Sequence, residues 1–288
     1  MRKRPDASDF SGRSLAFVPV DSGAARTLAA DQIECYNRQG YITGLPVFTP
    51  VEAAGIRAYI DDLLAAVLSA RDGRDSYSVN SYHPVCAGLW DLATDARIVS
   101  LVTDIVGGEA VCWGTHLFAK LPHDGKEVPF HQDAIYWPFE PSRTATVWLA
   151  IDDVDTDNAA MQFVPGSHLD GPIAHEVLAL DGTRVLGRRA LGMDGRPQRV
   201  VNELSAGRAS IHSDLLLHGS DANRSSRRRA GLTLRYAAAS VRVLDGFEEW
   251  TDAAVHVGRG DPSGWWPNRA RPDGDRPELM TTVGADAS

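Results

Sequence analysis

Apolar residues recur at helical spacing in the first third of the chain. The periodic segments are 28–39, 52–70 and 95–106. Thr49-Pro50-Val51-Glu52 has the spacing of a capping box with proline at the first helical position, and Gly107-Gly108 is a typical helix end. The pattern therefore predicts a mostly helical segment that ends near residue 108.

Short β-like runs replace the helical pattern from Ala110 onward. They are rich in Val, Trp, Phe, Thr and Ile, and turns containing Gly, Pro and Asp separate them. The runs are 110–121, 128–133, 144–151, 161–165, 208–217 and 230–237. Helices followed by many short strands predict an α+β fold, in which the helices buttress a jelly roll or barrel.

The two ends of the chain lack this patterning. Residues 1–26 are polar, and residues 267–288 are rich in proline, glycine and charge, so we expect both segments to be mobile. The rest predicts a single domain with a C-terminal extension. The domain spans 27–245, with a helical part over 27–108 and a β part over 109–245. The extension spans 246–288.

The composition narrows the choice of partner and compartment. The 288 residues include 29 Lys+Arg and 38 Asp+Glu, and the net charge of −9 argues against nucleic acid or an anionic membrane and favours a small molecule. Cys35, Cys86 and Cys112 form no C-x-x-C pair, which fits a reducing cytoplasm. No apolar run approaches the roughly 18 residues of a membrane span, and no apolar segment follows the basic N-terminus. We therefore expect a cytoplasmic protein.

Three H-x-D triplets are candidates for a metal site, because residues i and i+2 of a strand project to one face. His168-Leu169-Asp170 follows the turn sequence Pro-Gly-Ser, where that alignment is lost. His212-Ser213-Asp214 shares strand parity with His218, but on one straight strand positions 212 and 218 would lie ~20 Å apart. His131-Gln132-Asp133 ends a β-like run and pairs best with the distant His218. The spacing equally allows His131 and His218 to be hydrogen-bonded core residues and Asp133 to cap a turn.

Further motifs occur around these residues in a fixed order. They are Lys120-Leu121-Pro122, His131-Gln132-Asp133, Trp148, Asn158, Val164-Pro165-Gly166-Ser167-His168, His218-Gly219-Ser220, Asn223-Arg224-Ser225 and Arg229. From about Leu28 to Tyr236 the chain resembles the phytanoyl-CoA dioxygenase family of non-haem iron(II), 2-oxoglutarate-dependent oxygenases. This resemblance implies a double-stranded β-helix, or jelly roll, with iron near its open end.

The resemblance also implies roles for individual residues. His131, Asp133 and His218 match the catalytic iron ligands, and Arg229 matches the residue that binds the distal carboxylate of 2-oxoglutarate. Lys120, Trp148 and Gln162 match positions near 2-oxoglutarate. Lys120 could instead be a solvated strand residue and Trp148 a core residue. Two positions depart from the family pattern: Asn158-Ala159 replaces Asn-Gly, and Lys120-Leu121-Pro122 replaces Lys-Pro-Pro.

Aromatic residues after the His131–Asp133 pair are candidates for the wall of the substrate site. They are Tyr136, Trp137 and Phe139, with Trp113 and His116 on a neighbouring strand and 80–83 from the helical part. On a strand over 229–236, Arg229 would share one face with Gly231, Thr233 and Arg235. We expect the adjacent Arg227 and Arg228 to lie in solvent.

The resemblance implies an iron(II)- and 2-oxoglutarate-dependent dioxygenase with O₂ as the second co-substrate. It would hydroxylate a C–H bond of a small molecule, for which we expect a secondary metabolite, and would release succinate and CO₂. Asp133 argues against halogenation, because halogenating relatives have a small residue there. The alternative is a non-catalytic jelly-roll module that binds a ligand or zinc at the same triad, and Arg229 favours the enzyme. A zinc hydrolase is a third possibility, but G-x-S-x-G and H-E-x-x-H are absent.

Overall fold

The α-helices lie where the apolar spacing predicts them, with one addition. The computed structural model describes residues 13, 15–179, 181–196, 198–260 and 264–280. Its α-helices are α1 (Ala30–Gln39), α2 (Pro50–Ser69), α3 (Ala87–Thr94) and α4 (Ala96–Val106). The sequence pattern does not predict α3, because eight residues make little more than two helical turns and give a weak periodic signal. No described helix is both long and apolar enough to cross a membrane.

Local side-chain hydrogen bonds fix the ends of these helices. The capping box before α2 is confirmed: Glu52 N–H donates to Thr49 Oγ1 (3.3 Å), and Thr49 N–H donates to the Glu52 carboxylate (2.8 Å). The Asp95 carboxylate accepts from Arg97 N–H (2.9 Å) at the start of α4. Gly40 ends α1 in the left-handed conformation, with φ +86°, and a Cβ there would lie 2.7 Å from His168 Nδ1.

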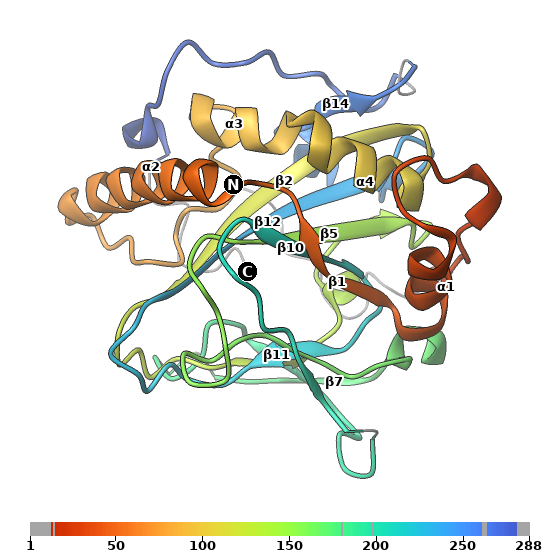
Figure 1. Cartoon of the computed structure of the whole chain (residues 1–288), viewed down its shortest axis with the longest axis horizontal. Coiled ribbons are helices and arrows are strands. Elements are labelled where there is room, and N and C mark those ends of the chain that lie inside the picture. The colour runs from red at the N-terminus through yellow and green to blue at the C-terminus, as the bar shows by residue number, and fades with distance from the viewer. Residues whose placement is uncertain (1–12, 14, 180, 197, 261–263, 281–288) are drawn as a thin grey trace.

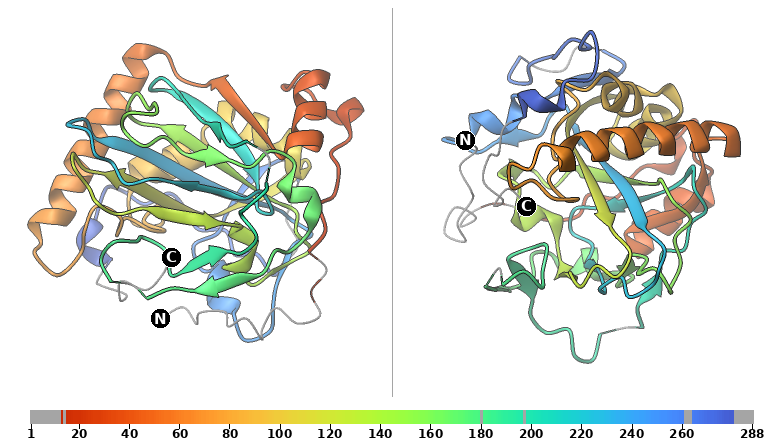
Figure 2. Two further views of the ribbon diagram at one scale, coloured as in Figure 1. Left: turned by 90° about the horizontal axis from the view of Figure 1, so that it is seen from below. Right: turned by 90° about the vertical axis from the view of Figure 1, so that its left-hand side faces the viewer.

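The strands form two sheets that face one another (Figure 1), and the left view of Figure 2 shows their strands from below. One sheet has the order β1-β10-β5-β12-β2-β14 and the other has the order β3-β11-β6-β9, with antiparallel neighbours throughout. The strands of the first sheet are β1 (Tyr41–Pro46), β2 (Glu109–Lys120), β5 (Thr144–Ala150), β10 (Arg208–Ser213), β12 (Arg229–Ala238) and β14 (Val255–Gly258). Those of the second are β3 (Val128–His131), β6 (Gln162–Phe163), β9 (Val200–Val201) and β11 (His218–Ser220). Two short pairs join β4 (Phe139–Glu140) with β13 (Arg242–Val243) and β7 (His175–Val177) with β8 (Arg188–Ala190).

The two faces of the six-stranded sheet differ in chemistry. Helices α2, α3 and α4 cover its outer face (Figure 1), and the buried residues there include Leu232 and Leu234. Its inner face, toward the four-stranded sheet, carries Arg229, Gly231, Thr233 and Arg235 at alternate positions of β12. The helices therefore bury the apolar side, and polar groups occupy the space between the sheets.

The described parts of both chain ends differ from the expected mobile tails. Arg13 donates to the carbonyl oxygens of Trp137 (2.7 Å) and Phe139 (2.9 Å), and Leu15 is buried. Near the other end, Arg271 donates to both carboxylate oxygens of Asp91 (2.6 and 2.7 Å). Composition alone missed these contacts because each involves a partner far away in the sequence.

Two inner-face glycines give a test of the packing between the sheets. A Cβ on Gly231 would lie 1.9 Å from the Trp148 ring, whereas the nearest atom to a Cβ on Gly114 is Ser81 Oγ at 3.6 Å. We expect Gly231→Ala to lower the free energy of unfolding by about 1–3 kcal/mol, because the indole must move. Gly114→Ala should leave it within about 0.5 kcal/mol. Urea unfolding of both variants checks this, and equal stabilities would contradict the register.

A candidate metal centre between the sheets

Two histidines face each other across neighbouring strands of the four-stranded sheet. His131 on β3 is paired with His218 on β11, and their ring centroids lie 4.3 Å apart. His131 Nδ1 lies 2.8 Å from the carbonyl oxygen of Pro129, and His218 Nδ1 lies 2.9 Å from that of Leu216. An N–H at each Nδ1 donates to these carbonyls, so each Nε2 keeps its lone pair for a metal.

Asp133 completes the group, although β3 ends at His131 and Asp133 begins the 3-10 turn Asp133–Ile135. Its Oδ1 lies 3.5 Å from His131 Nε2 and 3.9 Å from His218 Nε2, and Thr146 Oγ1 donates to its Oδ2 (3.2 Å). Burial acts to raise the pKa of Asp133, but His218 and the other neighbouring imidazoles outweigh burial and hold it well below its usual value. Burial and His131 keep the pKa of His218 well below its usual value. At neutral pH the group is therefore one carboxylate with neutral His218 beside it.

These three residues fit a divalent metal ion. One ligand atom from each lies within 4.8 Å of the others, and the exposures of His131, Asp133 and His218 are 4%, 7% and 6%. Two imidazoles and one carboxylate on one side of an ion form the set that suits non-haem iron(II) and leaves further positions open. Among the described residues, no second cluster of metal-ligating side chains meets the same distances.

His212 lies much closer to this group than the sequence spacing predicts. Its ring centroid is 4.6 Å from that of His218, and its Nε2 is 3.6 Å from Asp133 Oδ2. The assumption of one straight strand over 208–217 is wrong, because β10 and β11 belong to different sheets and the chain turns between them. His212 is buried, and neither ring nitrogen has a hydrogen-bond partner, so it borders the site without being fixed by the protein.

The other H-x-D residues have structural surroundings. Asp214 is buried, lies outside the triad ligand group and accepts a hydrogen bond from Ser142 Oγ (2.7 Å). His168 lies in the 3-10 turn Ser167–Asp170, where its Nε2 is 3.1 Å from the carbonyl oxygen of Asn37 and its ring meets Phe17 edge-on. Both arrangements agree with the expectation that these triplets do not hold the metal.

Arg229 begins β12 on the same inner face and carries a buried charge. Its Nε donates to the carbonyl oxygen of Ala159 (3.0 Å), and one terminal nitrogen donates to Ser220 Oγ (2.8 Å). Its guanidinium carbon lies 5.7 Å from the centroid of the Trp148 ring. Burial lowers the pKa of Arg229 to about 10, so the residue stays protonated at pH 7. It forms no ion pair with the residues that the structure describes, which leaves its charge for an anionic ligand.

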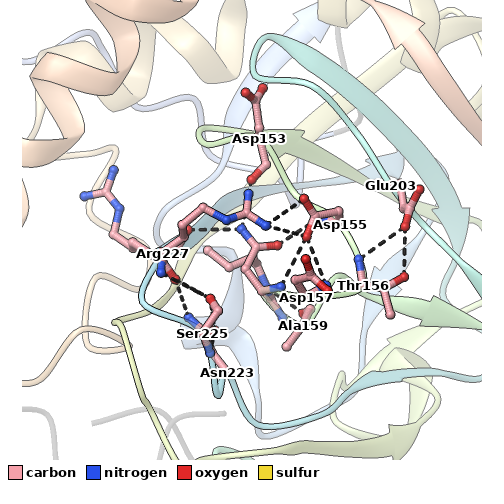
Figure 3. Close-up of polar contacts among 12 residues, drawn as sticks. Asp153, Asp155, Thr156, Asp157, Ala159, Glu203, Asn223, Ser225 and Arg227 are labelled. Atoms are coloured by element: carbon pink, nitrogen blue, oxygen red, sulfur yellow. Dashed lines mark hydrogen bonds and ion pairs between the residues drawn. The ribbon is translucent and has the colours of Figure 1, made fainter.

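The loop that contains Ala159, whose carbonyl binds Arg229, is held by a surface network of hydrogen bonds and ion pairs (Figure 3). Ala159 has φ +65°, the left-handed conformation for which the family's glycine is suited. Arg227 donates to both carboxylate oxygens of Asp155 (2.7 and 2.8 Å) and is 46% exposed, as expected for an outward residue. Arg228 does not lie in solvent as expected: it binds the buried Asp152 through two hydrogen bonds (2.8 and 2.9 Å).

The resemblance assigns three further residues to 2-oxoglutarate. Trp148 lies beside Arg229, whereas Lys120 and Gln162 differ from expectation. Trp148 is 2% exposed and packs against Arg229 and Gly231. Lys120 is buried, but its Nζ donates to the carbonyl oxygens of Lys126, Ser220 and Asp221, so the protein itself uses its donors. Gln162 donates to Asp221 Oδ2 (2.7 Å) and is paired with Gly219, one residue out of phase with the inward His218. The strand alternation therefore directs Gln162 away from the triad.

The predicted aromatic wall lies only partly beside the triad. Tyr136 meets the His131 ring edge-on at 5.6 Å. Trp137 packs edge-on against Trp113 at 4.7 Å, and both flank Arg235. His116 is buried, with its Nε2 2.7 Å from the carbonyl oxygen of Tyr77. Phe139 packs instead among Trp113, Trp250 and Trp266, in the core rather than against a triad ring.

Fold and site together define a class: an α+β protein with a buried two-histidine, one-carboxylate centre suited to non-haem iron. A sequence model of the family described as "Phytanoyl-CoA dioxygenase (PhyH)" matches residues 36–231, and the chain belongs to this family. Peroxisomal phytanoyl-CoA dioxygenase of Bos taurus is 28% identical over 163 residues, which make up 54% of this chain and 48% of the relative. The chain thus matches about half the length of that relative.

Solved structures agree with the fold. A non-heme monooxygenase, ThoJ, aligns with a TM-score of 0.72 and 24% identity over 84% of this chain and 88% of that chain. A non-heme alpha ketoglutarate dependent carbocyclase from nogalamycin biosynthesis, SnoK, aligns with a TM-score of 0.64 and 21% identity over 81% and 92%. At these identities the likeness supports the fold and does not carry the reaction.

The triad assignment predicts which carboxylate controls metal binding. We expect Asp133→Asn, His131→Ala and His218→Ala each to weaken iron(II) binding by at least about a hundredfold, since each removes a ligand. Asp214→Asn should keep the affinity within about threefold, because Asp214 lies outside the ligand group. Anaerobic calorimetric titration with iron(II) measures both. A loss in Asp214→Asn without one in Asp133→Asn would contradict the assignment.

Asp214 gives a separate prediction for pH. Burial raises its pKa to about 6 despite the hydrogen bond from Ser142, so the folded state holds this proton more tightly than the unfolded state. The resulting stabilisation is present below pH 4 and is lost as pH rises to about 6, a change of roughly 3 kcal/mol. Relative to Asp214→Asn, the unmodified protein should therefore lose stability from pH 4 to 6 and stay level above it. Urea unfolding across this range checks the slope, and parallel curves would contradict it.

Proposed function

We propose that this protein is an iron(II)- and 2-oxoglutarate-dependent dioxygenase that hydroxylates a C–H bond of a small molecule, with release of succinate and CO₂. The observation that carries the proposal is the convergence of His131, Asp133 and His218 on one point, with Arg229 buried and unpaired on the facing sheet. Membership of the phytanoyl-CoA dioxygenase family supports the same activity. We further propose that the two sheets are a double-stranded β-helix, or jelly roll, within one oxygenase domain over 27–245.

In this proposal the three triad residues hold iron(II), which with 2-oxoglutarate and O₂ supplies the oxidising power. The carbonyl oxygens of Pro129 and Leu216 fix the two imidazoles with Nε2 inward, and Thr146 fixes the Asp133 carboxylate. These contacts hold the ligands before the metal binds, which reduces the reorganisation on binding. The low exposure of the triad keeps bulk water away from the reacting atoms.

Arg229 is assigned to the distal carboxylate of 2-oxoglutarate. Its Nε and one terminal nitrogen are oriented by Ala159 and Ser220, which fixes the plane of the guanidinium before the ligand arrives. A planar, permanently charged fork matches a carboxylate in geometry as well as in charge. Trp148 would form the apolar side of this pocket. Lys120 is assigned to holding the carbonyl groups of the pocket rather than to the co-substrate.

The proposed substrate is a secondary metabolite, and the proposed location is the cytoplasm. A carbocyclase from nogalamycin biosynthesis among the structural neighbours supports a secondary metabolite as the substrate. The three free cysteines support a cytoplasmic location. Membership of the phytanoyl-CoA dioxygenase family favours the enzyme over the alternative of a non-catalytic binding module.

The 2-oxoglutarate assignment is tested by conservative substitution of two neighbouring arginines. Arg229→Lys keeps the charge but loses the planar fork, so we expect 2-oxoglutarate to bind about ten- to a hundredfold more weakly, with iron(II) affinity little changed. Arg227→Lys is the matched control, because Arg227 is on the surface and bound to Asp155. The weak absorption band of the anaerobic iron(II)–2-oxoglutarate complex reports both affinities. If the unmodified protein gives no such band, the proposed function is wrong.

A further inference from the structure

A second arginine on the inner face, which is partly buried, has no role in the function proposed above. Arg235 lies on β12 six residues after Arg229 and points to the same side. Its partner on β5 is Thr146, whose hydroxyl donates to the triad carboxylate of Asp133. Arg235 therefore lies on the part of the sheet that faces the metal centre, and six positions of an extended strand, roughly 20 Å, separate its Cα from that of Arg229.

Two tryptophans flank this guanidinium, and an irregularity in β2 positions one of them, Trp113. Arg235 is paired with Gly114 and Tyr236 with Cys112, so the register skips Trp113. Such a bulge redirects the side chain of the extra residue. The guanidinium carbon of Arg235 lies 5.6 Å from the Trp113 ring centroid and 5.4 Å from that of Trp137. Arg235 packs beside Gly114, where an added Cβ would be in ordinary van der Waals contact with Arg235 Cδ at 3.8 Å.

The hydrogen-bonding capacity of Arg235 is almost entirely unused. Its Nε is buried and has no partner, and its one polar contact is between a terminal nitrogen and His116 Nδ1 (3.5 Å). His116 directs its Nε2 at the carbonyl oxygen of Tyr77, so Nδ1 offers a lone pair and no negative charge. Burial, with the charge of Arg235, lowers the pKa of His116 to about 3, which keeps the ring neutral. Arg235 forms no ion pair with any residue in the described ranges.

The charge of Arg235 has no close counter-charge among the described residues. Burial lowers the pKa of Arg235, and the charge of Asp133 offsets this effect only in part, because the two side chains form no ion pair. A largely desolvated charge without a close counter-charge is costly. A ligand with a negative charge beside the guanidinium would remove that cost.

We propose that Arg235 binds a carboxylate of the substrate, so that the substrate class is a small monocarboxylate whose reacting carbon lies beside the triad. The inference rests on the proposed function, because the triad defines where the reaction occurs. The planar fork of the guanidinium matches a carboxylate, and Trp113 and Trp137 would pack against the apolar part next to it. A phosphate dianion fits less well, since its second charge would have no partner here.

The test uses the protein with iron(II) and saturating 2-oxoglutarate in the absence of O₂, so that the carboxylate site proposed at Arg229 is occupied and no turnover takes place. Benzoate, its uncharged analogue benzamide, and phenyl phosphate are titrated by calorimetry into the unmodified chain and four variants. The variants are Arg235→Gln, Arg235→Lys, Arg229→Gln and the control Arg242→Gln. Arg242 is also stacked on a tryptophan, 4.5 Å from the Trp265 ring, but is exposed. Thermal unfolding of each variant establishes that it is folded.

The unmodified protein should bind benzoate about ten- to a hundredfold more tightly than benzamide, the effect of a charge-assisted hydrogen-bond pair. Arg235→Gln should abolish this preference. Arg235→Lys should keep part of it, because the charge remains and the fork is lost, and this variant decides the matter if Arg235→Gln does not fold. Arg229→Gln and Arg242→Gln should both retain it.

Three results would overturn the proposal. Benzoate could bind no more tightly than benzamide, or its preference could follow Arg229 instead of Arg235. Phenyl phosphate could bind more tightly than benzoate, which would exclude a monocarboxylate site. None of these results depends on the iron(II)–2-oxoglutarate absorption band, so failure of this inference is distinguishable from failure of the proposed function.

Discussion

The pairing of β3 with β11 is the constraint on which the candidate site depends. His131 and His218 are 87 positions apart in the sequence, and only this antiparallel register brings their rings to 4.3 Å. A carbonyl two residues before each histidine, of Pro129 on β3 and of Leu216 just before β11, binds Nδ1 and turns Nε2 toward Asp133. Ligand distance and ligand protonation are therefore fixed by the same backbone.

The six-stranded sheet separates two tasks on its two faces. Its outer face carries leucines and valines that the helices cover, and this apolar contact supplies most of the buried core. Its inner face can therefore carry Arg229, Arg235 and Thr146, groups that a simple hydrophobic core would exclude. Arg229 is buried and Arg235 partly buried, and neither forms an ion pair with a described residue, which is consistent with a space built for anionic ligands.

Local sequence patterns predicted most elements, and they failed where the chain changes sheets. The capping box at Thr49 and the alternation along β12 are short-range signals, and the structure has both. The run over 208–217 looked like one strand because its residues remain β-like through the turn into β11. Strand propensity does not encode that turn, so the closeness of His212 to His218 was missed.

By itself, the sequence determined the α+β class, the family resemblance and the His131–Asp133–His218 candidates. These follow from periodicity, residue type and motif order, which are properties of neighbouring positions. Only the tertiary structure decided that Lys120 donates to backbone carbonyls, that Gln162 faces away from the triad and that Arg235 is unpaired beside it. The physical reason is that a hydrogen-bond partner or a counter-charge comes from a distant strand, and no local pattern records which strand that is.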